Sequence, residues 1–155
     1  MKKFSEFYHD LNGEFRENFP LANLTWFKVG GPAQILFIPE NKDDLIKFIK
    51  KCPVEYPKIV IGAGSNLLIR DGGIPGIVIS TQKVNSIKPL DLSLYAECGA
   101  LDMTISREAS KYGITGLEFL IGIPGTIGGG IKMNAGSYGM EIKDILQDVE
   151  VIDYS

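Results

Sequence analysis

The sequence has few of the residues that build metal centres and cross-linked folds. Its 155 residues include two cysteines, Cys52 and Cys98, and one histidine, His9. The cysteines do not form a CxxC pair, so we expect two reduced thiols, with neither a zinc site nor a disulfide framework. We therefore assign no metal ligand in this sequence.

An excess of basic residues and a long apolar run are also missing. The net charge of −3 argues against a nucleic-acid partner, because phosphate backbones require a positively charged surface. No apolar stretch approaches membrane length, and acidic residues interrupt the amphipathic amino terminus, which excludes a signal peptide. These absences predict a cytoplasmic protein that binds neither nucleic acid nor membrane.

Glycine and proline are abundant instead, with 18 and 8 residues respectively. Such a composition indicates many turns and close approaches of the backbone. Apolar residues make up 45% and charged residues 23% of the chain, as in ordinary globular proteins. The length suits one domain, or two small lobes that share a core.

Hydrophobic spacing predicts the elements of the first half. Apolar residues at intervals of three and four predict an amphipathic helix over residues 3–18, broken near Gly13. Strands are expected at residues 34–38, 58–61 and 76–80. Between the first two strands, Asn41 is expected to cap a helix that ends near Lys51. This order favours a small α/β lobe with some parallel pairing.

The second half is predicted to be less regular. We expect a strand at residues 93–97 and a half-buried strand at 148–154. Between them, a helix over residues 102–112 should end at Gly113 and turn Met103, Ile105 and Ala109 inward.

Glycine is concentrated in three clusters, at residues 25–33, 62–73 and 122–130. The middle cluster, GAGSNLLIRDGG, is not a Rossmann fingerprint, because Leu67 occupies the place of the third glycine and no helix can begin before Asp71. The third cluster is not a Walker loop, because Ile131 and Lys132 stand where Lys and Ser/Thr are required.

A phosphate cradle without a helix remains. Small residues over 62–65 let successive backbone N–H groups face one anion, and Ser65 and Asn66 add side-chain donors. The third cluster has the same character, with Pro124 in the turn and the Thr126 hydroxyl beside it. Two such loops favour a long ligand such as a dinucleotide, although each loop alone is also typical of a plain turn.

The clusters together are far more specific than each one alone. The stretches TWFKVGGPA, GAGSNLLIRDGGIPGIVI and GLEFLIGIPGTIGGGIKMNAGSYG, in this order, resemble the UDP-N-acetylenolpyruvoylglucosamine reductase family. These are FAD-dependent enzymes of bacterial cell-wall precursor synthesis, within the vanillyl-alcohol-oxidase-like flavoproteins. The resemblance runs from about Leu21 to the end of the chain.

The resemblance implies an α+β chain with the PCMH-type FAD-binding fold, in which two α+β lobes hold FAD between them. Following the helical arm that the apolar spacing predicts within residues 1–20, it places the first FAD-binding lobe at 21–82 and the second at 83–155. The second lobe is expected to be incomplete at its carboxyl end, with the chain truncated before the substrate-binding domain.

The resemblance also implies which residues bind FAD. They lie in the two glycine loops and in the segment that follows the second loop: Gly62, Ala63, Gly64, Ser65, Asn66, Leu67, Gly122, Ile123, Pro124, Gly125, Thr126, Gly128, Gly129, Asn134, Ala135 and Gly136.

The implied reaction uses NADPH as the reductant and a UDP-sugar as the substrate. Hydride passes from NADPH to FAD, and then to the enolpyruvyl group of UDP-N-acetylglucosamine enolpyruvate, giving UDP-N-acetylmuramate. The family's protonating serine, glutamate and arginine are expected beyond Ser155. We therefore assign no catalytic residue and expect no turnover from these 155 residues alone.

Other interpretations stay open from the sequence. The chain could be a non-catalytic FAD-binding or interaction module, or part of a flavin oxidase of the same superfamily. Among single residues, Glu118 could act in acid–base chemistry or serve a structural role, and Lys132 could meet a phosphate or lie exposed. Tyr138 could pack on the ligand or in the core. His9 is expected in a surface or packing role, and the oligomeric state is left open.

Overall fold

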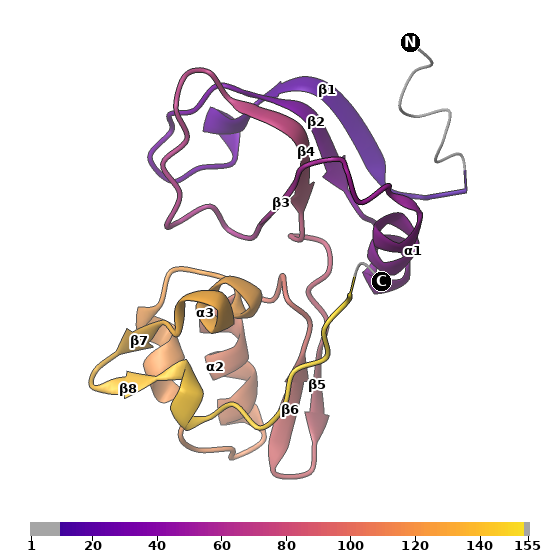
Figure 1. The fold of residues 1–155 in the computed structure, drawn as a ribbon. Coiled ribbons are helices and arrows are strands. Elements are labelled where there is room, and N and C mark those ends of the chain that lie inside the picture. Colours follow the sequence, from indigo (N-terminus) through magenta and orange to yellow (C-terminus); the bar gives the residue numbers. More distant parts are fainter. Residues whose placement is uncertain (1–9, 154–155) are drawn as a thin grey trace.

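The computed structural model describes residues 10–153, which form two lobes, one above the other in Figure 1. His9 and the beginning of the predicted amino-terminal helix lie outside the described residues. Within the described range, no helix is long and apolar enough to cross a membrane.

The first lobe is a four-stranded mixed sheet with the strand order β1-β2-β4-β3. Its strands are β1 (Glu14–Pro20), β2 (Pro32–Ile38), β3 (Lys58–Ile61) and β4 (Ile74–Ser80). β1 pairs antiparallel with β2, whereas β4 pairs parallel with both β2 and β3. The predicted strands in this lobe and their partly parallel pairing are confirmed.

Helix α1 (Lys42–Lys51) connects β2 to β3, as the sequence predicts. The Asn41 side chain accepts a hydrogen bond from the Asp44 amide at 3.0 Å, which satisfies one of the free donors of the first turn. Acidic residues stand in the first turn and lysines in the last, where each complements the helix dipole.

The sheet separates two apolar cores because alternate side chains of a strand point to opposite faces. On one face, Phe37 of β2 and Ile77 of β4 pack against Phe48 of α1. On the other face, Leu36 of β2 and Val78 of β4 join a cluster that also holds Leu21, Ala33, Ile61 and Ile69. Leu21 begins a short 3₁₀ turn, η2 (Leu21–Asn23).

The predicted helix over residues 3–18 is wrong in its described part. Residues 14–20 form β1, and Phe15 stacks on Phe37 of β2 with the ring centroids 4.5 Å apart. Pairing with β2 satisfies the backbone of this segment and places Phe15 over the core, so tertiary packing overrides the helical spacing.

The second lobe packs short helices against a two-stranded hairpin. The hairpin consists of β5 (Ile87–Leu90) and β6 (Ser93–Ala96), and a smaller one consists of β7 (Gly136–Ser137) and β8 (Met140–Glu141). The helices are α2 (Asp102–Lys111), η3 (Glu118–Gly122), α3 (Ile127–Met133) and η4 (Ile142–Asp144). A separate core, which includes Ile105, Phe119, Leu120, Ile127 and Ile142, holds them together.

The predictions for this lobe are confirmed in part. Strand β6 and helix α2 form where they were expected, and Gly113 follows α2 with a φ of +65°. Ile105 and Ala109 are buried, but Met103 is 39% exposed, so its predicted inward position is wrong. The strand predicted over 148–154 is also wrong in its described part, because residues 148–153 pair with no strand within residues 10–153 to satisfy their backbone.

Candidate functional site

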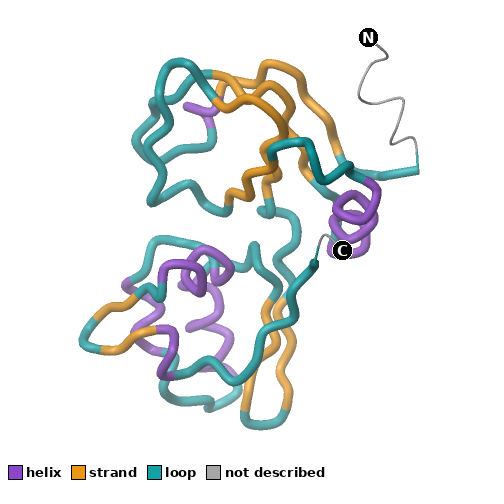
Figure 2. The backbone as a smooth tube through the Cα atoms, viewed as in Figure 1, coloured by secondary structure: helices purple, strands orange, loops and turns teal. Residues whose placement is uncertain are grey.

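The first glycine loop follows β3 directly and contains neither a helix nor a strand before β4 begins (Figure 2). The prediction that no helix starts here is confirmed. Gly64 adopts a φ of +68°, and its carbonyl accepts a hydrogen bond from the Trp26 amide at 3.1 Å. A Cβ at Gly64 would lie 2.2 Å from the carbonyl oxygen of Leu24, so both the conformation and the space require glycine.

The backbone of this loop has free donors. Within the described chain, no acceptor is paired with the amide N–H groups of the four residues Ala63, Gly64, Ser65 and Asn66. Consecutive unpaired amides in a glycine-rich turn form a nest that suits an anion. Gly64 is buried while its neighbours are partly or fully exposed, so a ligand can approach the loop from one side.

The structure brings the two predicted glycine loops together. A Cβ at Gly62 would lie 2.1 Å from Oγ1 of Thr126, and a Cβ at Gly125 would lie 3.8 Å from Oγ of Ser65. Gly62 therefore allows the lobes to touch at this point. The two loops, about sixty residues apart in the sequence, form one continuous surface.

The second loop differs from the first because its backbone is largely paired. The amides of Ile127 and Gly128 donate to the carbonyls of Ala100 and Cys98, both at 2.9 Å, and the Gly125 carbonyl accepts from Asp102 at 3.1 Å. This segment continues as α3, so the prediction of a cradle without a helix is wrong for the second loop. The second loop therefore contributes to the shape of the site and does not supply a set of free amide donors.

A cavity of about 680 Å³ opens where the loops meet. One residue of the first loop, Ala63, lines this cavity. Four residues of the second loop also line it: Ile123, Pro124, Gly125 and Thr126. Other lining residues come from the segment before α2 and from its first turns, including Leu101, Met103 and Thr104. The walls are mainly apolar, and Ala63 brings one of the four unpaired amides to the edge of the cavity.

The remaining predicted residues lie elsewhere around the loops. Gly62, Gly64, Ser65, Asn66 and Leu67 belong to the nest loop but do not line the cavity, and Leu67 packs on the core of the first lobe. A Cβ at Gly122 would meet Ser137 Oγ at 2.5 Å, and one at Gly128 would meet the Cβ of Cys98 at 2.8 Å, so both glycines permit close packing. Gly129 is exposed on α3.

The segment at residues 134–136 does not reach the cavity. Asn134 has a φ of 47° at the end of α3, and its side chain bonds to the Glu141 carboxylate at 2.9 Å and to the Lys143 amide at 3.0 Å. Ala135 packs on the core of the second lobe, and Gly136 pairs with Glu141 in the β7–β8 hairpin. Asn134 is therefore already engaged by this hairpin.

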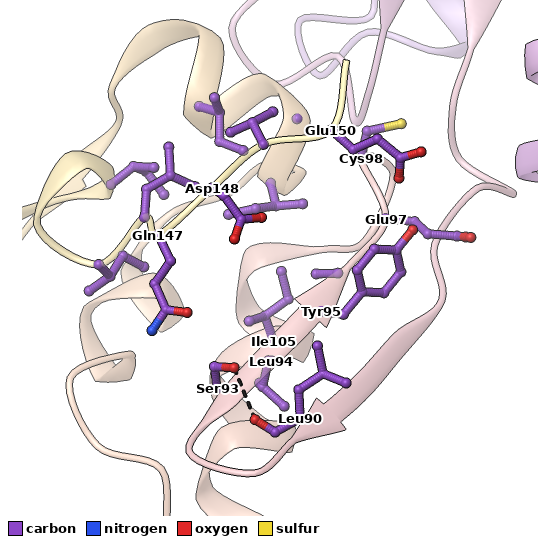
Figure 3. Close-up of a pocket in the computed structure, with 18 of the residues that line it drawn as sticks. Leu90, Ser93, Leu94, Tyr95, Glu97, Cys98, Ile105, Gln147, Asp148 and Glu150 are labelled. Atoms are coloured by element: carbon purple, nitrogen blue, oxygen red, sulfur yellow. Dashed lines mark hydrogen bonds between the residues drawn. The ribbon is translucent and has the colours of Figure 1, made fainter. Parts of the chain in front are cut away.

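A second cavity, of about 600 Å³, lies between the β5–β6 hairpin, α2 and the carboxyl-terminal segment (Figure 3). Gly128 lines this cavity, whereas the residues of the nest do not. Lys42 of α1 bonds to Tyr95 at 3.2 Å and to Glu150 at 2.5 Å, which ties the segment carrying Glu150 to the first lobe.

Two residues at the site were not identified from the sequence. Trp26 lines the cavity with 59% of its surface exposed. Asp102 is fully buried, and neither of its carboxylate oxygens has a hydrogen-bond partner in the described chain. Burial raises the pKa of Asp102 to about 6. A tryptophan beside a glycine cluster is a usable sequence signal, but an acidic residue in the first turn of a helix is too common to be one.

The single residues weighed from the sequence have ordinary positions. Glu118 is exposed and accepts a hydrogen bond from the Gly116 amide at 2.8 Å, which is a structural role. Lys132 is exposed on α3. Tyr138 is 84% exposed, so the interpretation that it packs in the core is wrong.

Comparison with known protein families gives a match over most of the chain. The FAD binding domain family matches residues 33–155, which include both glycine loops and every cavity residue except Trp26. The chain belongs to this family. FAD is accordingly the cofactor of this FAD-binding domain, and the features of the site can be compared with that ligand.

Similar curated proteins carry one name. A UDP-N-acetylenolpyruvoylglucosamine reductase of Phenylobacterium zucineum is 51% identical over 138 residues, which are 88% of this chain and 46% of the relative. One from Orientia tsutsugamushi strain Boryong is 46% identical over 148 residues, which cover 92% of this chain and 49% of the relative. The FAD-binding domain thus spans about half the length of the curated relatives it matches.

Solved structures agree on the fold. The UDP-N-acetylenolpyruvylglucosamine reductase of Thermus caldophilus matches with a TM-score of 0.65 at 35% identity, over 86% of this chain and 46% of that one. Cholesterol oxidase from B. sterolicum matches with a TM-score of 0.58 at 17% identity, over 83% of this chain and 25% of that one. This is a likeness of fold alone. The predicted α+β, PCMH-type FAD-binding fold is confirmed.

The residues present fit this dinucleotide. The unpaired amides of the nest suit its pyrophosphate, and the mainly apolar cavity beside them suits a planar ring. Both features adjoin the Gly62–Thr126 contact, so a long ligand could reach both of them.

Proposed function

We propose that this chain is the FAD-binding part of a UDP-N-acetylenolpyruvoylglucosamine reductase. Such an enzyme uses NADPH to convert UDP-N-acetylglucosamine enolpyruvate to UDP-N-acetylmuramate in peptidoglycan precursor synthesis. Relatives at 45–51% identity over most of this chain carry that name, and the single observation that supports the binding role is the nest of free amides beside the cavity. A flavin oxidase is less well supported, because the oxidase match is 17% identical.

The binding role divides between the two lobes. In this proposal, residues 21–82 together with β1 form the first FAD-binding lobe, and residues 83–155 belong to the second. The amides of Ala63–Asn66 hold the pyrophosphate, and Ser65 and Asn66 add side-chain donors. Ile123–Thr126 form the opposite wall, where Pro124 and Gly125 allow the ligand to lie close to the backbone.

Several of the remaining predicted residues hold the two loops in place and do not line the cavity. Gly62 and Gly64 let the nest adopt its shape, Leu67 anchors the nest to the core, and Gly128 holds α3 against Cys98. Gly122, Gly129 and the segment Asn134–Gly136 remain proposed contacts of the bound cofactor.

When bound, FAD would supply the redox chemistry for hydride transfer from NADPH to the enolpyruvyl group. This chain contributes binding, orientation and exclusion of water from the ligand. No residue of it is assigned a catalytic role. The proposal includes a cytoplasmic location and interactions with NADPH and a UDP-sugar, without nucleic acid or membrane, and it leaves the oligomeric state open.

The test begins with the purified chain, its flavin absorbance and an FAD titration. We expect a yellow protein, or a colourless one that binds added FAD in a one-to-one ratio. A chain that binds no FAD under any condition would overturn the binding role. NADPH oxidation that depends on the enolpyruvyl sugar is then measured, and we expect none from residues 1–155. Turnover by this chain would show that its residues include the catalytic groups.

A further inference from the structure

A buried carboxyl group without a partner lies behind the proposed pyrophosphate site. Asp102 is the first residue of α2, has no exposed surface, and neither Oδ1 nor Oδ2 receives a hydrogen bond from the described residues. Buried polar groups are nearly always paired, because removing them from water without a partner is unfavourable. The fold therefore holds Asp102 in an environment that disfavours its charged form.

The carboxyl group is directed at the second glycine loop. A Cβ at Gly125 would lie 3.1 Å from Oδ2 of Asp102, and one at Gly130 would lie 3.7 Å from Oδ1. The same Gly125 position is 3.8 Å from Oγ of Ser65, whose amide is one of the four unpaired donors. Oδ2 of Asp102 and Oγ of Ser65 therefore both lie around the space that a Gly125 side chain would fill, no more than 6.9 Å apart.

No charged side chain compensates Asp102 from the elements packed against it. Gly125 of the second loop and Gly130 of α3 face its oxygens, and the Ser65 hydroxyl lies near the same Gly125 position. None of these residues is ionisable, and desolvation is the sole cause of the raised pKa. The dipole of α2 gives partial support to a negative charge at its first residue, but the helix amides make no hydrogen bond to this carboxyl group.

A second negative charge near Asp102 must raise its proton affinity further. The FAD pyrophosphate carries two negative charges that do not titrate near neutral pH. In the proposed site these charges lie on the nest, close enough to act on Asp102 through a medium of low polarity.

We propose that Asp102 takes up a proton when the pyrophosphate of FAD binds to the nest. The inference rests on the proposed function, because it requires FAD at Ala63–Asn66. Its consequence is that FAD binds more tightly at lower pH. A binding-induced rise of at least one unit in the proton affinity of Asp102 weakens FAD binding about fivefold or more between pH 6 and pH 8.

The experiment is calorimetric titration of the purified chain with FAD at pH 7, in phosphate and in Tris. These buffers have different heats of ionisation, so the difference in observed heat gives the number of protons taken up. We expect roughly 0.4 of a proton or more per FAD bound, according to the same linkage. The affinity is also measured at pH 6 and pH 8.

The variant Asp102→Asn removes the titrating group at nearly constant volume, and we expect it to abolish both the proton uptake and the pH dependence. The matched control is Asp43→Asn, since Asp43 is an exposed acid in the first turn of α1 and should leave both unchanged. The wild-type measurement alone decides the inference if the Asp102 variant fails to fold.

The possible outcomes separate this inference from the proposed function. FAD binding without proton uptake overturns the inference alone. Proton release, or affinity that rises with pH, also overturns it, because Asp102 would then accept a hydrogen bond from the ligand as a carboxylate. Failure to bind FAD at every pH overturns the proposed function and this inference together.

Discussion

Gly62 of the first lobe lies directly against Thr126 of the second, so closely that a Cβ on Gly62 would be 2.1 Å from the Thr126 hydroxyl oxygen. Thr126 is buried and lines the cavity between the lobes. The absence of one methyl group at residue 62 therefore determines how closely the nest can approach the opposite wall.

Gly62→Ala should separate the two loops and weaken both folding and FAD binding. We expect it to reduce the free energy of unfolding by about 1–3 kcal/mol, the usual effect of overpacking a tight contact. The measurement is urea unfolding of the apo chain, followed by FAD titration.

Thr126→Ala provides the second arm of a double-mutant cycle. It removes Oγ1 and Cγ2, two of the three atoms that the new Cβ would meet, so the double variant should recover part of the lost stability, with a coupling energy of about 0.5–3 kcal/mol. Gly72→Ala is the matched control, because no atom lies within 4 Å of its Cβ position. Additive effects of Gly62→Ala and Thr126→Ala would contradict a direct steric contact.

Asp44 connects α1 to the chain entering β1. Its Oδ1 accepts the Asn12 amide at 3.0 Å and its Oδ2 accepts the Glu40 amide at 3.1 Å. Asp44→Ala leaves both amides unpaired and should lower the free energy of unfolding by about 2–4 kcal/mol. Urea unfolding tests this, and hydrogen exchange at the Asn12 amide should become faster. The exposed neighbour gives the control, since Asp43→Ala should change stability by less than about 1 kcal/mol.

Local signals in the sequence were sufficient for α1, α2 and the parallel part of the first sheet. Asn41 and the charges along α1 mark both ends of that helix, and alternate residues of β2 and β4 face different cores. β1 could not be recognised in the same way, because the position of Phe15 among its apolar neighbours fits both the helical period and the strand period. Its stacking on Phe37, a contact distant in sequence, decides the outcome.

Elements that depend on distant partners were missed or wrongly predicted. Helix α3 contains three consecutive glycines, which disfavour a helix, yet it forms because the backbone of Cys98–Ala100 accepts its first amides. Residues 148–153 alternate like a strand but pair with no strand among the described residues. At the site, the nest followed from glycine spacing, whereas the burial of Asp102 depends on how α2 packs against the second loop.

The raised pKa of Asp102 predicts how stability depends on pH. Since the folded-state pKa is about 6 and the ordinary value is 3.8, the folded protein binds this proton more tightly than the unfolded chain does. Stability from this group is fully present below the ordinary pKa and is lost as pH rises through about 6. Between pH 4 and pH 7 the loss should be about 2 kcal/mol.

Urea unfolding of wild type and Asp102→Asn across this range isolates the effect, because other titrating groups are common to both proteins. The variant should gain stability relative to wild type as the pH rises, whereas Asp43→Asn should run parallel to wild type. A constant difference between wild type and Asp102→Asn would show that Asp102 does not titrate between pH 4 and pH 7.

Trp26 offers an independent view of the ligand site, because it is the one tryptophan in the sequence and lines the cavity with 59% of its surface exposed. FAD binding should quench its fluorescence, as a planar ring of the ligand comes to lie against the indole. Trp26→Ala should weaken FAD binding about tenfold, the usual contribution of one aromatic stacking contact, while Trp26→Phe should retain most of the affinity. Phe27→Ala is the matched control, since Phe27 is 61% exposed and does not line the cavity. Equal losses for Trp26→Ala and Phe27→Ala would place the ligand outside this cavity.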